Sequence, residues 1–381
     1  MRLAVYTDYS YRRDAHGVTG ERAFVRFMTG LEPLVDELVL VGRLDPQPGR
    51  SHYPLAPSIG FVGLPFYTSL THPLKVGASL RRSAARFWRL LDDVDTVWLL
   101  GPYIHAIGFA LLALARGKRV ALGVRQDFPT YVRSRHPSLR WTHLAADLLE
   151  RTFRALGRRL PVAVVGPDLA RNYAGSARLL ELTVSLVSES DLVDPEAALA
   201  RPPGAPPRVL SVGRLDREKN PLLLADILAG LLAHGTDWRL DVVGDGPMHD
   251  ELASRFEQLG CAEAAELHGY VPIDGGLIAL YRSADVLLHV SWTEGLPQVL
   301  FEAFAAGVPV VATDVGGVRD AAGDAALLIP PGDADAAVAA VERVRTDPRL
   351  RRALVEAGAA RAREHTLERE ASRLLAFLRG D

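Results

Sequence analysis

The chain has 381 residues, more than one ordinary hydrophobic core accommodates, so its length predicts two compact domains. Hydrophobic residues make up 48% and charged residues 24%, a balance that excludes an intrinsically disordered chain. The net charge is −2, yet residues 51–180 hold 18 Lys and Arg against 7 Asp and Glu. A slightly acidic total without a recognition motif argues against nucleic acid as a partner.

The start of the chain and its apolar runs bear on its compartment. The first residues lead directly into a strand pattern, with no apolar signal-peptide core. The apolar run at 107–115 is too short to cross a bilayer and is followed by Arg116 and Lys118. We therefore expect a cytoplasmic protein that is not an integral membrane protein.

The first half alternates short β-branched runs with longer amphipathic stretches, the pattern of a parallel sheet covered by helices. This predicts a doubly wound, Rossmann-like domain over residues 1–187. A proline-rich segment follows, with five prolines from Pro195 to Pro207, where we predict neither helix nor central strand. We interpret 188–206 as a linker. The predicted strands of the first half are 3–7, 37–41, 96–100, 120–124, 162–165 and 184–187.

The alternation restarts after the linker and predicts a second Rossmann-like domain over 207–365. The pattern from about 349 to 380 is helical, and 366–381 is a C-terminal helix that ends the chain. Two α/β domains of this kind, facing each other, form a cleft at the carboxyl ends of their strands, where such sheets bind ligands. The predicted strands of the second half are 208–212, 239–243, 266–268, 286–290, 310–313 and 327–329.

A pair of cations follows the first strand of the second domain. Arg214 and Lys219 stand five residues apart in the loop after Gly213. A guanidinium binds phosphate oxygens in pairs and an ammonium adds a point charge, so together they suit a diphosphate without a metal ion. The alternative is a solvated basic loop, but the chain has only three lysines, which makes a chance lysine here less common.

A second loop, Gly244-Asp245-Gly246-Pro247, follows the next strand. Its glycines let the backbone approach a ligand closely, although a plain tight turn explains them equally well. The loop lacks the third glycine of a dinucleotide fingerprint and does not open the chain's first βαβ unit. A nicotinamide role is therefore disfavoured.

The segment 284–307 reads as strand, loop and helix and contains two glutamates. Pro297 suits the first helical turn and Gly307 the end of the helix, so the free amides of Gly295 to Gln298 would face a phosphate. Glu294 lies in the loop and Glu302 lies two turns deeper, in an apolar setting where an idle carboxylate is costly. The alternative is an acid at a helix start and a solvated helical glutamate.

In order and spacing these motifs resemble retaining glycosyltransferases with the GT-B fold, in the large group 1 (family 4) class. The resemblance covers about 207–365 and also rests on the segments 268–272 and 309–317. It implies that Arg214 and Lys219 hold the diphosphate of a nucleotide sugar, that Glu294 touches the transferred sugar, and that Glu302 binds ribose. Further donor contacts implied by the resemblance are Gly213, Gly244, Gly246, Tyr270, Val271, Gly295, Leu296, Pro297 and Gln298.

The first half resembles the family less closely. In the family a paired-glycine loop near the N-terminus brings its backbone close to the donor phosphate; only Gly20, after Thr19, is present here, and the resemblance implies that it binds the donor. A histidine that is common in the family after the strand ending at Val124 is replaced by Arg125, Gln126 and Asp127. Together with His105, which is either structural or directed at the cleft, these three are the acceptor-side candidates.

The resemblance implies transfer without cofactor or metal to an acceptor that is a small molecule, a glycan or a lipid-linked compound. We interpret Asp333-Ala334-Asp335 as a helix cap rather than an Asp-x-Asp metal motif. A non-catalytic sugar-nucleotide-binding protein and a GT-B epimerase or phosphorylase remain alternatives.

The basic region 81–159 is the candidate for peripheral contact with the inner face of a membrane. Within it, residues 133–159 mix arginines with leucines and aromatic residues, as interfacial helices do. A solvated helix face and recruitment of a phosphorylated or lipid-linked acceptor are the other interpretations of the same pattern.

Overall fold

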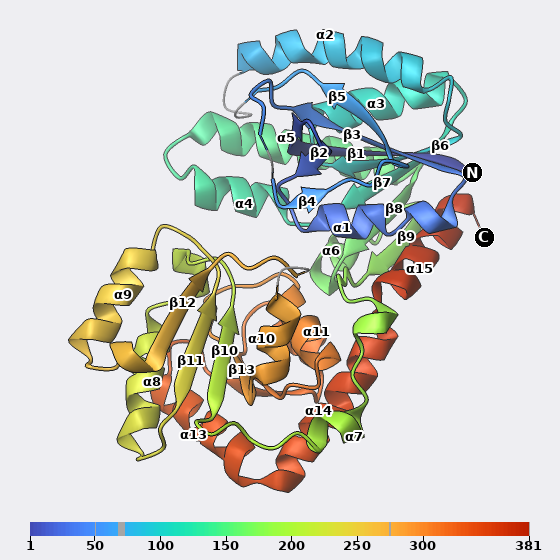
Figure 1. The fold of residues 1–381 in the computed structure, drawn as a ribbon. Helices are drawn as coiled ribbons and strands as arrows, with labels where there is room; N and C mark the ends of the chain where they lie inside the picture. Colours follow the sequence, from blue (N-terminus) through green and yellow to red (C-terminus); the bar gives the residue numbers. More distant parts are fainter. Residues whose placement is uncertain (50, 68–72, 274–275, 381) are drawn as a thin grey trace. The chain divides into compact units, whose positions relative to one another are not determined.

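The computed structural model describes residues 1–49, 51–67, 73–273 and 276–380, and its contacts divide the chain into two units (Figure 1). The first unit comprises Met1–Val184 together with Leu367–Asp381, and the second comprises Ser185–Thr366. The chain therefore passes between the units twice. The segment 188–206, predicted as a linker, lies within the second unit.

The second unit is built on a six-stranded sheet in the order β12-β11-β10-β13-β14-β15, in which all pairings are parallel. Parallel strands are buried on both faces, which explains their continuous apolar sequences. The bounds are β10 Arg208–Val212, β11 Arg239–Val243, β12 Ala265–Gly269, β13 Val286–His289, β14 Val310–Thr313 and β15 Ala326–Ile329.

Helices cover both faces of this sheet (Figure 1). Neighbouring residues of a strand point to opposite faces, so Val209 packs with α8, α9 and α13 while Leu210 packs with α10, α11 and α12. The helices are α7 Pro195–Leu199, α8 Leu223–Ala233, α9 His249–Gln258, α10 Leu277–Ser283, α11 Gln298–Ala305, α12 Val318–Ala322, α13 Ala334–Thr346 and α14 Pro348–Glu364, with short 3₁₀ turns η2 Glu189–Asp191, η3 Arg217–Lys219 and η4 Ala262–Ala264.

The first unit has a nine-stranded sheet in which β5, β3, β1, β6, β7, β8 and β9 pair in parallel in that order. A hairpin adds β2 antiparallel to the long β1, and β4 pairs antiparallel with β2. The bounds are β1 Arg2–Asp14, β2 Gly17–Gly20, β3 Glu37–Leu44, β4 Tyr53–Pro54, β5 Gly60–Leu64, β6 Thr96–Gly101, β7 Arg119–Val124, β8 Pro161–Val165 and β9 Arg178–Leu182.

Both faces of the first sheet are also covered. Phe109 of α3 and Phe87 of α2 pack on one face, and Phe24 of α1 contacts Trp98 on the other. Helix α15 packs against β9, and its Arg373 donates to the carbonyl of Glu181. The helices are α1 Phe24–Thr29, α2 Pro73–Leu90, α3 Ile104–Ala115, α4 Phe128–Arg135, α5 Arg140–Gly157, α6 Pro167–Asn172 and α15 Leu367–Arg379, with the 3₁₀ turn η1 Glu32–Leu34.

Two predictions of secondary structure are wrong. The apolar run 184–187 is buried but forms no strand, and the edge strand is the more polar β9, Arg178–Leu182. The proline-rich segment does contain a helix, which Asp194 caps. Pro195 occupies its first turn, where the backbone N–H that proline lacks would have no partner within the helix.

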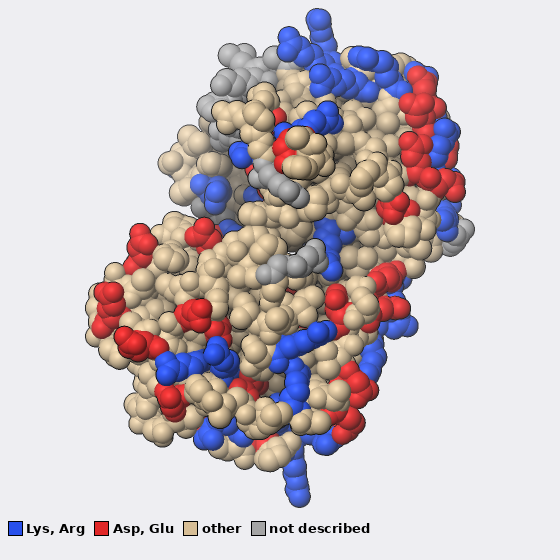
Figure 2. All heavy atoms as spheres, viewed as in Figure 1, with Lys and Arg blue, Asp and Glu red and all other residues tan. Residues whose placement is uncertain are grey.

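The surface repeats the charge difference between the two parts of the sequence. On the face drawn in Figure 2, Lys and Arg side chains gather over α2 of the first unit, and Asp and Glu side chains gather over α9 of the second. Among the helices of the described segments, none combines the length and the apolar content that a bilayer crossing requires.

Candidate functional site

The carboxyl ends of β10 and β11 carry two loops that pack directly on each other. The amides of Gly213 and Leu215 donate to the carbonyls of Val243 and Asp245, at 2.9 and 3.0 Å. Gly244 has φ +137°, and a Cβ there would lie 1.8 Å from the carbonyl oxygen of Gly213. A Cβ on Gly246 would lie 2.6 Å from that of Leu215. Backbone packing thus requires both glycines, independently of any ligand.

The loops after β13 and β14 meet in the same manner. Gly316 has φ +49°, and a Cβ on it would lie 2.0 Å from the carbonyl oxygen of Glu294. A Cβ on Gly317 would lie 1.9 Å from the carbonyl oxygen of Gly295. This close approach fixes the backbone of the loop that carries Glu294.

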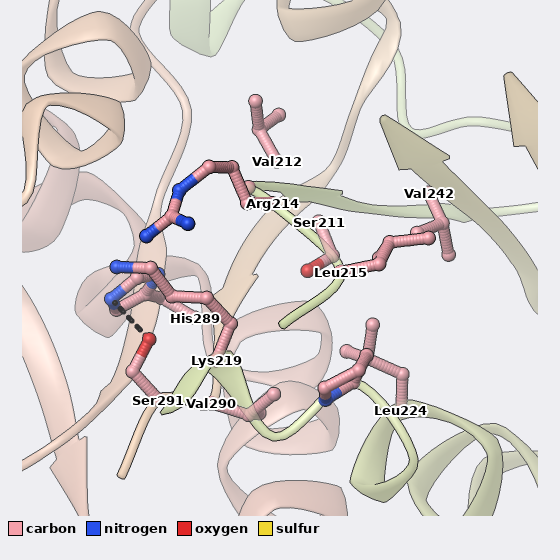
Figure 3. Close-up of a pocket in the computed structure, with 12 residues that line it drawn as sticks. Ser211, Val212, Arg214, Leu215, Lys219, Leu224, Val242, His289, Val290 and Ser291 are labelled. Carbon is pink, nitrogen blue, oxygen red and sulfur yellow. Dashed lines mark hydrogen bonds between the residues drawn. The ribbon is translucent and has the colours of Figure 1, made fainter. Parts of the chain in front are cut away.

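A shallow, open pocket lies at this edge of the second sheet. Arg214, Lys219, His289 and Ser291 are among the residues that line it. In Figure 3 the charged ends of Arg214 and Lys219 point to the same side of the pocket, where the imidazole of His289 also lies. Residues 75 positions apart in the sequence are thus brought together by β10 and β13, neighbours in the sheet.

The two predicted cations have different partners. Arg214 is exposed and forms ion pairs with Asp216 and Glu218 of its own loop. The ammonium of Lys219 donates to Oε1 of Glu294 at 2.6 Å. A backbone hydrogen bond of 2.8 Å from Trp292 to the carbonyl of Glu218 also ties the two loops together.

Glu294 is the most strongly held carboxylate of the site, with a side chain 7% exposed. Its Oε1 accepts from Lys219 and from the Ser291 hydroxyl at 2.6 Å, and lies 2.8 Å from Nε2 of His289. Burial raises the pKa of this carboxyl, but the hydrogen bond from His289 and the charge of Lys219 outweigh it and lower the pKa to about 2. Glu294 is therefore ionised at neutral pH.

Helix α11 begins next to this carboxylate. It starts at Gln298 with Pro297 as its N-cap, one residue later than predicted, and Gly307 follows its end with φ +69°. The side chain of Leu296 packs on the core beneath the loop. Glu302, on the same helix, accepts a hydrogen bond from the Tyr281 hydroxyl at 2.7 Å.

The predicted base-lining residues lie at the end of β12. Tyr270 has a 40% exposed side chain, whereas Val271 packs against the core below α10 and α11.

The structure places His105 in the core of the first unit, with its residue 1% exposed. Its ring stacks on Tyr67 and lies near Phe109, and neither ring nitrogen has a hydrogen-bond partner among the described residues. Burial lowers its pKa to about 4, so it is neutral at pH 7. Nearby, buried Asp8 accepts from Tyr6 at 3.2 Å and from Tyr67.

The other first-unit candidates have structural contacts. Gly20 ends β2, opposite Tyr11, and a Cβ there would lie 2.6 Å from a methyl group of Val25. Arg125 donates to the Tyr9 hydroxyl and lies 3.8 Å above the ring of Phe24, and burial lowers its pKa to about 10.

The residues beside Arg125 differ from it in exposure. Gln126 is exposed, and Asp127 caps α4 by accepting from the amide of Thr130 at 3.0 Å.

One group of described side chains could offer three ligand atoms to a metal ion: Asp241, Glu266 and His268. Both oxygens of Asp241 are already bonded, to Arg208 at 2.9 Å and to His268 at 2.8 Å, and the guanidinium opposes a second cation. Asp333 caps α13 by accepting from the amide of Ala336, as predicted.

Two residues of the site escape the sequence patterns. His289 is the last residue of β13, in a buried apolar run where a histidine suggests only core packing, and Ser291 is one of many loop serines. Only the folded loop, which returns Glu294 toward the strand end, shows that both contact its carboxylate.

Comparisons with known proteins identify the family and the fold of this chain. Residues 198–361 match the family model described as glycosyl transferases group 1. The chain is 30% identical to a phosphatidyl-myo-inositol mannosyltransferase of Mycobacterium leprae, over 84% of this chain and 86% of that protein. It is 25% identical to a sulfoquinovosyl transferase of Arabidopsis thaliana, over 90% of this chain but only 66% of that protein.

A solved structure has the same fold. The Anabaena protein HepE, in complex with UDP, superposes with a TM-score of 0.73 at 15% identity, covering 100% of both chains.

Proposed function

Because this chain belongs to the family of group 1 glycosyltransferases and has their GT-B fold of two Rossmann-like domains, we propose that it transfers a sugar from a nucleotide-diphosphate sugar to an acceptor. The observation that carries the proposal is that Arg214 and Lys219 line one open pocket of the second unit and that the ammonium of Lys219 contacts Glu294.

The diphosphate of the donor binds at this pocket in the proposal. Arg214 exchanges its ion pairs with Asp216 and Glu218 for two phosphate oxygens, and Lys219 supplies a second positive charge. The free amides at the start of α11, near Gly295, add partial positive charge. These groups neutralise the diphosphate as a metal ion does elsewhere.

The two glutamates bind the uncharged parts of the donor. Glu294 is ionised and accepts a hydrogen bond from a hydroxyl of the transferred sugar. Glu302, oriented by the hydroxyl of Tyr281, accepts one from the ribose. Backbone groups near Tyr270 and Val271 contact the base.

The reaction retains the configuration of the sugar. The bond between the anomeric carbon and the phosphate oxygen breaks, and the leaving diphosphate takes the proton of the acceptor hydroxyl. The acceptor oxygen then bonds to the anomeric carbon on the face that the diphosphate has left. Arg214 and Lys219 stabilise the charge that develops on the diphosphate, so they lower the barrier to bond cleavage.

A melting-temperature screen of nucleotide sugars tests donor binding, because a true donor stabilises the folded chain by mass action. The Arg214→Ala/Lys219→Ala variant is expected to lose that shift and to lose transfer by at least about 10³-fold, since two charge contacts are removed. Arg217→Ala removes a charge from the same loop outside the pocket and is expected to behave as wild type. Transfer at the wild-type rate by the double variant would refute the proposal.

The products distinguish the alternatives. Donor binding without hydrolysis or transfer would identify a non-catalytic binding protein. A changed free nucleotide sugar would identify an epimerase, and dependence on inorganic phosphate a phosphorylase.

For the acceptor side, we propose that α5 contacts an anionic membrane. Leu144 and Leu148 are 73% and 66% exposed and, with exposed Trp141, form one stripe along the helix. Exposed Arg140 and Arg151 border this stripe. Apolar side chains flanked by arginines match an anionic lipid surface better than another protein face. Such a surface suits a lipid-linked acceptor.

Sedimentation with vesicles of phosphatidylcholine and phosphatidylglycerol tests this surface. Leu144→Glu/Leu148→Glu is expected to abolish binding, and high salt to weaken it in the wild type. Leu111→Glu/Leu114→Glu makes the same change at exposed leucines of α3 and is expected to retain binding. Equal binding by both variants, or loss of a dimer instead of vesicle binding, would contradict the membrane assignment.

A further inference from the structure

His289 is an unusual residue for its position. Strand β13 is buried along its whole length, and the preceding residues Val286, Leu287 and Leu288 are apolar. An imidazole there is desolvated, and its polar nitrogen needs a partner to offset that cost. The partner is a carboxylate beside the pocket that His289 lines: Nε2 of His289 lies 2.8 Å from Oε1 of Glu294.

Three groups converge on this one carboxylate oxygen. Lys219, Ser291 and His289 all contact Oε1, at 2.6, 2.6 and 2.8 Å. Nε2 of His289 is also 3.2 Å from the Ser291 hydroxyl. Because a carboxylate only accepts, the imidazole makes this contact with a hydrogen on Nε2.

The three groups differ in how they are attached. His289 and Ser291 belong to the same strand and loop as Glu294, and the Ser291 carbonyl is held by the Thr313 hydroxyl at 2.8 Å. Lys219 comes from a separate loop on a flexible side chain. A donor diphosphate competes with Glu294 for the same ammonium, so donor binding draws Lys219 away.

A buried carboxylate that loses its cation is strongly destabilised unless other donors remain. We propose that His289 is a positioning residue that holds Oε1 of Glu294 in place when Lys219 turns to the diphosphate. This inference rests on the proposed donor site. It makes His289 and Ser291 the fixed half of the network and Lys219 the exchangeable half. Glu294 thereby keeps its orientation toward the sugar throughout turnover.

The test replaces the donor group of His289 while keeping its volume. His289→Leu removes the hydrogen bond and is expected to lower kcat by about 10- to 100-fold, the cost of a misplaced group. It also weakens binding of the nucleoside diphosphate, because Lys219 then remains with Glu294. His289→Gln supplies an N–H at a similar reach and is expected to restore most of both properties. Ser291→Ala is expected to give a smaller loss in the same direction.

His268 provides a matched control in the same sheet. Its Nε2 lies 2.8 Å from Oδ1 of Asp241, the same kind of contact, but outside the pocket. His268→Leu and His268→Gln are expected to change the melting temperature without changing kcat or nucleotide binding.

The readouts are kcat, the dissociation constant of UDP or GDP, whichever the wild type binds more tightly, and the melting temperature. Equal kcat in wild type and His289→Leu, or equal losses in the Leu and Gln variants, would overturn the inference. Absence of nucleotide binding in the wild type would instead contradict the proposed function.

Discussion

In the second unit, the ionisable side chains at the carboxyl ends of the strands border a pocket, and Lys219 and Glu294 neutralise each other there. In the first unit, Asp8 lies where the pairing of β1 with β3 is interrupted between Tyr6 and Ser10, and His105 lies in the first turn of α3, but both are closed into the core. Arg43 approaches Asp8 to 3.4 Å, and Tyr6 and Tyr67 donate to it. The same edge of two similar sheets thus has opposite environments.

This difference separates two kinds of burial. The pKa of Glu294 is lowered because donors outweigh its desolvation, whereas the pKa of Asp8 is raised because desolvation outweighs Arg43 and the tyrosines. A carboxylate that is kept charged at a pocket is ready for a ligand. One that resists ionisation within a core serves the fold of its own unit.

The largest expected effect compares two glycines that follow parallel strands. Gly244→Ala places a Cβ 1.8 Å from the Gly213 carbonyl oxygen, so the loops after β10 and β11 must separate. We expect kcat/KM to fall by at least about 10²-fold. Gly166 follows β8 in the first unit with φ +86°, and a Cβ there would meet no described heavy atom within 4 Å apart from its own chain neighbours.

Gly166→Ala is therefore expected to cost only backbone strain, about 1–2 kcal/mol, with activity unchanged. Steady-state kinetics and chemical denaturation measure both variants. Equal activity losses would remove the contrast between the units.

Acid titration of Glu294 is the next largest effect. Its folded pKa of about 2 lies below its ordinary value of 4.5, so its contribution is complete above pH 4.5 and is lost as the pH falls toward 2. The shift corresponds to about 3 kcal/mol. In calorimetry, Glu294→Gln is expected to destabilise the chain at pH 6 and to approach wild type near pH 2. A constant difference over this range would contradict the assigned shift.

Asp8 is expected to show the opposite sign. Its pKa is raised in the folded state, so the folded carboxyl binds its proton more tightly and stability falls as the pH rises through and above 3.8. Asp8→Asn removes this titration. The free energy of unfolding of the wild type minus that of the variant is therefore expected to decrease as the pH rises. An increase in this difference with pH would mean that the pKa of Asp8 is lowered in the folded state, as that of Glu294 is.

The smallest expected effect is at His105. His105→Phe keeps an aromatic ring beside Tyr67 and Phe109, and is expected to change stability at pH 7 by at most about 1 kcal/mol and activity not at all. The pKa of folded His105, about 4, lies below its ordinary value of 6.5, so the wild type loses stability as the pH falls from 6.5 to 4. The variant has no imidazole at this position and is not expected to show that loss. A large loss of transfer at pH 7 would assign His105 to the acceptor site.

The second sheet is readable from sequence almost residue by residue. Strands 208–212, 239–243 and 310–313 are found with the predicted bounds, because parallel strands buried on both faces are continuous apolar runs between turns. The first sheet is less readable. Its hairpin strand β2 is Gly17–Gly20, and the edge strand β9 has charged residues at two of its positions, Arg178 and Glu181, so neither is a continuous apolar run.

The site shows the same limit. Charged residues at a strand end predicted a diphosphate site at Arg214 and Lys219, and both side chains line one pocket. The contact between His289 and Glu294 depends on how the intervening loop turns, and this is set by Gly316 of another loop. Such a relation between two loops that are distant in the sequence leaves no local sequence pattern.

The double passage of the chain between the units determines how the gene can be dissected. The second unit is one uninterrupted stretch, Ser185–Thr366, whereas helix α15 completes the first unit from beyond it. During synthesis the ribosome therefore finishes the whole second unit before the first acquires its last helix. Two cuts suffice to isolate the second unit as a fragment, while the first requires its two pieces to be spliced together.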